Sequence, residues 1–225
     1  MIPPKESATD VAKLEDVLAV YRRPLDPAVP LVCVDESGKE LQADLIAPLP
    51  IRPGYPLYTD PGYRRQGSAS LLLAFAPSLG WRTIAVTAQR THREWAETMH
   101  DLVDVHFPDA DRICVVLDNL NIHVLGSLYH RFPPAEAFRI AQKLALHYTP
   151  VHGSWLNRAE LEFSALQRMG LHGRRVPTRE HLATEIAAWV AERNVAQVKV
   201  TWQFTPEDAR RAMPHVYPPQ QDNQP

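Results

Sequence analysis

The stretch ICVVLDNLNIH, residues 113–123, contains the pattern that decides the fold. A run of branched apolar residues stops at Asp118, and Asn119, Asn121 and His123 follow it. An uninterrupted apolar run of this length is typical of a strand that is buried on both faces of a sheet. Asp and Asn also favour turns through local hydrogen bonds, so this stretch alone leaves two interpretations, a simple strand end or a functional carboxylate.

The remaining apolar runs predict an α/β fold with a mixed five-stranded sheet flanked by helices. LVCVDE (residues 31–36) has the same form as 113–118, the runs 68–77 and 81–88 predict a hairpin, and LALHY (144–148) predicts a last strand. Apolar residues at helical spacing predict helices over the segments 7–23, 91–103, 133–144 and 154–169, and a further helix that starts at Thr178 and includes Val190. Thr91 and Glu94 are expected to form a capping box at the start of the second of these helices. This order places antiparallel strands first and parallel strands later, as in the ribonuclease H-like architecture.

The composition predicts a cytoplasmic protein with a sizeable core. Of 225 residues, 45% are hydrophobic and 22% are charged, which suits one large domain, and the net charge of −2 restricts any nucleic-acid contact to local basic patches. Cys33 and Cys114 lie in predicted strands, which favours buried, reduced thiols over a disulfide or a zinc site. The first ten residues lack the apolar core of a signal peptide, and no apolar run approaches the length of a membrane span.

Two predicted strands end in aspartate, at Asp35 and at Asp118. Ligand and catalytic sites in open α/β sheets form at the carboxyl ends of strands, near the point where the strand order reverses. If these two strands are neighbours, their carboxylates repel each other, and a divalent cation removes that repulsion. Hard oxygen ligands of this kind suit Mg²⁺ or Mn²⁺.

Three blocks, VCVDE, VVLDNLNIH and HGSWLNRAELEFSALQR, closely resemble the acidic blocks of DDE transposases, in the same order. The likeness is closest to the bacterial insertion-sequence (IS six-thirty type) branch of the mariner superfamily and runs from about Ile2 to Asn194. It implies a ribonuclease H-like catalytic domain that uses two Mg²⁺ or Mn²⁺ ions to cut and rejoin DNA. It also implies that DNA is the partner, both transposon ends and target, and it makes a homodimer plausible.

The resemblance assigns catalytic and metal-binding roles to three acids. Asp35 matches the first catalytic aspartate and Asp118 the second. In the third block, Leu156 and Asn157 match the family pattern LN..E, which makes Glu160 the third acid. Helical periodicity alone does not choose between Glu160 and Glu162, because both lie at similar angles from the apolar stripe of the predicted helix.

The neighbours of the second aspartate carry a weaker prediction. Asn119 and Asn121 are expected to support the carboxylates from behind, and His123 to orient a substrate phosphate or a metal-bound water beside them. Turn chemistry with a helix that starts near His123 is the alternative. Glu36 is expected to point away from Asp35, because side chains alternate along a strand, and it is left out of the predicted site.

Two basic segments are candidates for DNA contacts. The first lies in the proline- and glycine-rich segment 47–67, which predicts a long surface loop and contains Arg64 and Arg65. The second follows the acidic helix and contains Arg168, Arg174 and Arg175. These arginines are expected to neutralise phosphates, and an ordinary solvated loop is the alternative.

The predicted organisation is an N-terminal helix and connector (1–30), a DDE catalytic domain (31–195) and a partly disordered C-terminal extension (196–225). Full-length relatives carry a helix-turn-helix recognition region, whereas only 34 residues precede Asp35, so we expect a catalytic domain without that region. Bound to DNA, such a protein would lie at the bacterial nucleoid. Two alternatives stay open: a structure-directed nuclease on the same fold, and a non-catalytic remnant that binds a full-length transposase through helix 7–22.

Overall fold

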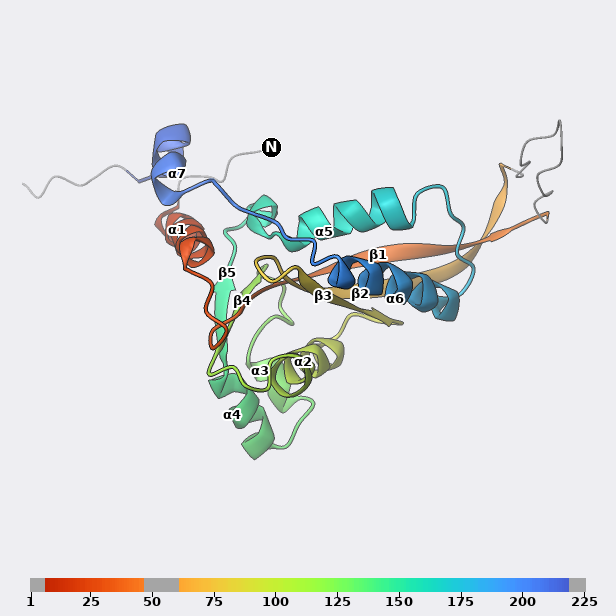
Figure 1. The fold of residues 1–225 in the computed structure, drawn as a ribbon, viewed down its shortest axis with the longest axis horizontal. Coiled ribbons are helices and arrows are strands. Elements are labelled where there is room, and N and C mark those ends of the chain that lie inside the picture. Colours follow the sequence, from red (N-terminus) through yellow and green to blue (C-terminus); the bar gives the residue numbers. More distant parts are fainter. Residues whose placement is uncertain (1–6, 47–60, 219–225) are drawn as a thin grey trace, which may run out of the picture.

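The computed structural model describes residues 7–46 and 61–218. Its centre is a five-stranded sheet in the order β3-β2-β1-β4-β5 (Figure 1). The strands are β1 Leu31–Asp44, β2 Tyr63–Ala76, β3 Trp81–Thr87, β4 Ile113–Leu117 and β5 Leu144–Tyr148. The α-helices are α1 Ala8–Arg22, α2 His92–Asp101, α3 Gly126–Tyr129, α4 Pro134–Gln142, α5 Ala159–Ala165, α6 Arg179–Val195 and α7 Pro206–Ala212.

Strand direction changes at β1, as the order of elements predicts. β1 pairs antiparallel with β2, and β2 pairs antiparallel with β3. On its other side β1 pairs parallel with β4, and β4 pairs parallel with β5. The mixed five-stranded sheet flanked by helices is therefore confirmed, and its central strand β1 is the point at which the order reverses.

Helices cover both faces of the sheet (Figure 1). One face packs against α2, α3 and α4 in a cluster that includes Trp95, Met99 and Ile140, all fully buried. The opposite face packs against α1, α5 and α7, with Leu18 and Phe75 at its centre. Each residue of β4 is buried, which explains why its sequence is apolar without alternation. The sheet edge that carries the acidic residues is thus held rigidly between two helical layers.

The predicted surface loop 47–67 is partly wrong. Residues 63–67 belong to β2, and β1 continues to Asp44, so the two strands form an arm that extends beyond the other strands (Figure 1). Residues 47–60 lie outside the described part of the chain. This part of the arm has few apolar residues because most of its surface is exposed, and composition alone therefore read it as loop.

Three helical predictions need correction. The predicted helix 154–169 is a 3₁₀ turn, Ser154–Leu156, then α5, then a π-helical turn, Leu166–Gly170, and it breaks where Asn157 adopts an extended conformation. Helix α7 was not predicted. Helix α1 is an integral part of the core, with Leu14, Val17 and Leu18 buried, so its apolar face is not free for a partner.

Other expectations from the sequence are met. Cys33 and Cys114 are buried and reduced, and Thr91 and Glu94 form the capping box of α2. None of the helices within residues 7–46 and 61–218 combines the length and apolar character needed to span a bilayer. The polar tail from residue 219 onward lies outside the described residues.

Candidate active site

Asp35 and Asp118 lie next to each other at one edge of the sheet. The parallel register of β1 and β4 pairs Cys33 with Val116, and each aspartate lies two residues further along its strand. Because neighbouring parallel strands advance together, this register brings the two carboxylates to the same edge. The sequence predicts this neighbourhood only if the two strands pair, and they do.

Glu160 reaches this edge because the start of α5 is tied to β1. The side chain of Asn157 donates a hydrogen bond to the Val34 carbonyl (2.8 Å), directly before Asp35, and accepts one from the amide of Ala159 (3.1 Å). The first bond anchors the segment to the strand, and the second caps the first turn of α5. Glu160 follows one residue later and projects from that turn.

The three acids line one cavity of about 350 Å³. The other residues that line it are Glu36, Ser37, Ser154, Asn157, Phe163 and Ser164. The oxygens of the three acids do not all lie within 4.8 Å of one another, whereas the ligand atoms of His100, Asp104 and Glu136 do. Two ions bound side by side are themselves about 3.5–4 Å apart, so three carboxylates that flank such a pair are more widely spaced than the ligands of one ion.

The electrostatics of the cavity favour a bound cation. Burial raises the pKa of Asp35 to about 7, and the negative charges of Asp118, Glu36 and Glu160 act in the same direction. Within the described residues, neither Asp35 nor Glu160 forms an ion pair with a basic side chain. Oxygen donors with uncompensated charge are the ligands that Mg²⁺ and Mn²⁺ prefer, so the residues present fit the predicted ions.

Asp118 has a different environment, because one of its oxygens is already bonded. Its Oδ1 lies 2.6 Å from Nδ1 of His123 and accepts a hydrogen bond from the amide of Leu120 (3.0 Å). The bond to His123 lowers the pKa of Asp118. Burial lowers the pKa of His123, but its hydrogen bonds to Asp118 and Glu36 outweigh that effect and raise it to about 9. His123 therefore lies at the carboxylate edge, where it binds Asp118 directly.

Within the matched family model, described as DDE superfamily endonuclease, the chain aligns over residues 30–183. The chain belongs to this family. No curated protein sequence matches the chain.

Solved structures of the Mos1 mariner transposase are similar in fold to this DDE domain. The paired-end complex with Mn gives a TM-score of 0.57 at 13% identity and covers 96% of this chain and 64% of that chain. The strand transfer complex gives 0.55 at 12% identity over 96% and 64%, and the pre-cleavage transpososome 0.55 at 11% over 98% and 67%. At this identity the likeness shows the fold, and the ribonuclease H-like class is confirmed. The chain spans about two thirds of the length of these transposase chains.

Glu162, the alternative third acid, points away from the DDE cavity. Its side chain is 1% exposed, and Oε1 lies 2.8 Å from Nε of Arg82 and 2.7 Å from Nε of Arg193. Arg193 also donates to Oε2 at 3.1 Å. The carboxylate thus bridges two guanidinium groups and joins α5 to β3 and α6. These ion pairs give Glu162 a structural role, whereas Glu160 has no ion-pair partner within the described residues.

The two asparagines do not contact the three acids. Asn119 accepts a hydrogen bond from Nζ of Lys13 and donates one to the Thr149 carbonyl, both at 2.6 Å. Asn121 lies exposed in the turn after β4. Of the three neighbours predicted for the site, only His123 touches one of the acids. Sequence reasoning missed Glu36. Its side chain points to the side of β1 opposite Asp35, as predicted, and there its Oε1 lies 2.6 Å from Nε2 of His123.

The five arginines predicted to bind DNA differ in their partners. Arg65 pairs with Glu40 at 3.0 Å, Arg174 with Glu185 at 2.5 Å, and Arg175 with Asp44 at 2.6 Å. Arg64 and Arg65 lie exposed on β2 rather than in a loop. Within the described residues, no carboxylate lies at ion-pair distance from Arg64 or Arg168, which leaves these two with uncompensated charge.

Arg168 lines a second hollow, which is larger than the acidic cavity. The hollow measures about 570 Å³, and Lys39, His172, Arg174 and Arg175 also line it. One hydrogen bond links a residue of each hollow, because Ser164 lines the acidic one and its carbonyl accepts a hydrogen bond from Nε of Arg168 at 3.3 Å. Lys39 and His172 were not predicted. The fact that Lys39 lies four residues after Asp35 on β1 is the signal that could have found it.

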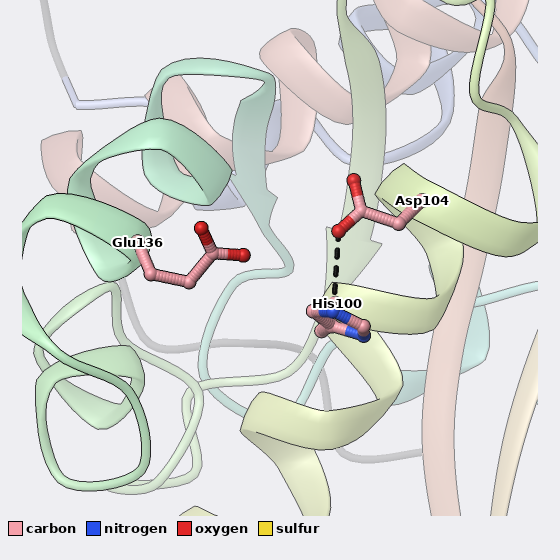
Figure 2. Close-up of side chains that lie close together, drawn as sticks. All are labelled: His100, Asp104 and Glu136. Atoms are coloured by element: carbon pink, nitrogen blue, oxygen red, sulfur yellow. Dashed lines mark ion pairs between the residues drawn. The ribbon is translucent and has the colours of Figure 1, made fainter.

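A separate cluster on the outside of the domain resembles a metal site only in its residue types. Figure 2 shows His100, Asp104 and Glu136, whose ligand atoms lie within 4.8 Å of one another. Nη2 of Arg139 lies 2.6 Å from both carboxylates, and these bonds raise the pKa of Arg139. The guanidinium binds both acids and offsets part of their charge, so this cluster is a surface ion-pair network.

Proposed function

We propose that this chain is the catalytic domain of a transposase of the insertion-sequence (IS six-thirty type) branch, and that it cleaves DNA and transfers strands by a two-metal DDE mechanism. The observation that carries the proposal is that Asp35, Asp118 and Glu160, from three separate sequence blocks, line one cavity at the edge of the sheet. The branch assignment rests on the three blocks quoted from the sequence.

Each acid has a distinct part in this proposal. Two bound Mg²⁺ or Mn²⁺ ions supply stabilisation of the attacking and leaving oxygens of the phosphodiester. Asp35, whose pKa is about 7, is only about half ionised at neutral pH, and a bound cation would favour its ionised form. Asp118 presents its free Oδ2, because His123 and the Leu120 amide hold Oδ1. Glu160 approaches from α5 and closes the cavity on the side opposite the strands.

The larger hollow offers a path for the DNA backbone. Lys39, Arg168 and His172 line it, and Arg168 donates a hydrogen bond to the carbonyl of Ser164, which lines the acidic cavity. Phosphates that enter it meet positive charge a short distance from the acids that act on the scissile bond. Association with a second copy or with a full-length transposase is part of the proposal.

The two alternatives make different demands on the structure. A structure-directed nuclease on this fold needs the acids but has no requirement for the GSWLNRAE block, in which Asn157 ties α5 to β1. A non-catalytic remnant that binds a transposase through α1 needs a free apolar face on that helix, and this face is buried against the sheet. Both observations favour the catalytic proposal.

The proposal is tested by titrating Mn²⁺ and Mg²⁺ calorimetrically into the wild type and an Asp118→Asn variant, with nicking of supercoiled DNA measured on the same samples. Asp104→Asn is the matched control, because it removes one carboxylate from the His100 cluster and leaves the cavity intact. We expect wild type and Asp104→Asn to bind metal and nick DNA, and Asp118→Asn to lose both. Metal binding that survives in Asp118→Asn and disappears in Asp104→Asn would place the ion in the other cluster and refute the proposal.

A further inference from the structure

Glu36 and Asp118 bind opposite edges of one histidine ring. Oε1 of Glu36 lies 2.6 Å from Nε2 of His123, and Oδ1 of Asp118 lies 2.6 Å from Nδ1. Both oxygens belong to carboxylates, which only accept hydrogen bonds when ionised, so the ring donates through both nitrogens. The result is a continuous chain from β1, through the loop after β4, to the end of β4.

Burial separates the two ends of this chain. The side chain of His123 is 0% exposed and that of Glu36 is 3% exposed, whereas that of Asp118 is 40% exposed. In this conformation the carboxylate of Glu36 is therefore nearly inaccessible to solvent and binds the ring of His123. Asp118 opens to the cavity and can meet a ligand there.

Further contacts hold the ring in place. The hydroxyl of Tyr148 donates to the His123 carbonyl at 2.7 Å, and the Trp95 ring lies 6.2 Å from the imidazole, centre to centre. These contacts fix the backbone and one face of the ring. Rotation of the imidazole about its bond to Cβ is restrained by the ring's two hydrogen bonds, and Glu36, which also lines the cavity, supplies the bond to Nε2.

We propose that Glu36 is a positioning residue, which acts through His123 to fix the Asp118 carboxylate with Oδ1 turned inward and Oδ2 presented to the cavity. The inference rests on the proposed function, since it concerns how Asp118 presents itself to a metal ion. Glu36 does not touch the ion in this arrangement. Residues that orient a ligand in this way typically change metal affinity by 10- to 100-fold when they are replaced.

The test is a double-mutant cycle on Mn²⁺ binding, measured by electron paramagnetic resonance of the free ion. Wild type, Glu36→Gln, His123→Asn and the double variant are compared, with the fraction folded taken from circular dichroism. Glu97→Gln is the control, because it removes a carboxylate that pairs with Arg93 and Arg131 on the far side of α2. Asp118→Asn reports separately on the proposed function.

We expect each single variant to raise the Mn²⁺ dissociation constant roughly tenfold and the double variant to raise it no further, because both changes break the same chain. Glu97→Gln should match wild type. If Glu36→Gln does not fold, His123→Asn carries the same expectation, because it removes the middle of the same hydrogen-bond chain.

Two results would overturn the inference while leaving the proposed function intact. An affinity within twofold of wild type in folded Glu36→Gln would show that Glu36 positions nothing. An equal loss from Glu36→Gln in the presence and absence of His123 would make Glu36 a direct ligand. By contrast, wild-type protein that binds no Mn²⁺, or an Asp118→Asn variant with unchanged affinity, would refute the proposed function itself.

Discussion

Replacing Glu162 by glutamine tests which of Glu160 and Glu162 is the third acid of the site, a choice that helical periodicity leaves open. Glu162 is 1% exposed, and its carboxylate lies between Arg82, which is fully buried, and Arg193, which is 13% exposed. The substitution removes the negative charge and leaves two guanidinium groups facing each other with little access to water. Breaking a buried ion pair by neutralising one partner destabilises a protein by about 3–5 kcal/mol.

The hydrogen bonds that Arg82 keeps in the variant place the expected destabilisation at the lower end of the range of about 3–5 kcal/mol. Arg82 keeps hydrogen bonds to the Val198 carbonyl (2.5 Å) and to Oδ1 of Asn194 (3.3 Å), so part of its desolvation is still compensated. We therefore expect a loss of about 3 kcal/mol in the free energy of unfolding. For a chain of this size, that loss lowers Tm by roughly 6–12 °C.

Glu160→Gln should behave in the opposite way. Glu160 has no ion-pair partner within the described residues, and its charge raises the pKa of Asp35. Its neutralisation removes a repulsion, so we expect the stability of the metal-free protein to change by less than about 0.5 kcal/mol or to rise. Nicking of supercoiled DNA should fall to background at temperatures where the variant is fully folded.

Thermal unfolding of the metal-free proteins, followed by circular dichroism, and DNA nicking at 20 °C measure the two effects independently. A Glu162→Gln variant with wild-type Tm and no nicking activity, beside a Glu160→Gln variant with the reverse phenotype, would falsify the assignment and make Glu162 the third acid. Glu97→Gln, which alters a surface ion pair, controls for loss of a glutamate as such.

Three further outcomes are expected. Asp35→Asn should stabilise the metal-free protein above pH 7 by about 2–4 kcal/mol in chemical denaturation, because the folded wild type binds a proton at Asp35 with a pKa of about 7, whereas the unfolded chain releases it near pH 4. Wild type should therefore lose stability as the pH rises from about 4 to 7, and the variant should not. A stability difference between the two proteins that does not vary with pH would contradict this. Arg168→Ala should reduce the salt dependence of DNA binding by about one phosphate contact, and Arg174→Ala, whose charge is paired, should reduce it less, as measured by fluorescence anisotropy at several salt concentrations. Leu18→Ala should cost about 2–5 kcal/mol of stability, measured by urea unfolding, because the side chain is fully buried between α1 and the sheet; a negligible effect would show that α1 is a dispensable arm.

The parts of the fold that sequence analysis predicts are those in which local pattern and burial agree. The apolar run before Asp118 gives β4 because a strand buried on both faces excludes polar residues, and the same reasoning gives the first half of β1. The arm formed by residues 37–44 and 63–67 escapes prediction because its surfaces are largely exposed, so its strand character comes from pairing between distant segments rather than from its own sequence.

Two omissions had different causes. Helix α7 carries a capping box, in which Thr205 and Asp208 bond each other's backbone amides, and this pattern is visible in the sequence. Glu36 was excluded by strand alternation, which predicts its direction correctly but says nothing about what lies on that side. Its partner His123 arrives from a loop 87 residues later, so only the folded structure brings the two together.

Leu156 and Asn157 of the third sequence block position Glu160 relative to the strands. Leu156 is fully buried, and its carbonyl accepts a hydrogen bond from the hydroxyl of Tyr21 on α1 at 2.6 Å. The next residue, Asn157, binds the Val34 carbonyl and caps α5, and Glu160 follows at the first turn. The contacts of Leu156 with α1 and of Asn157 with β1 thus fix where α5 begins, and this places Glu160. The spacing LN..E is what places a carboxylate from a helix against two carboxylates from strands.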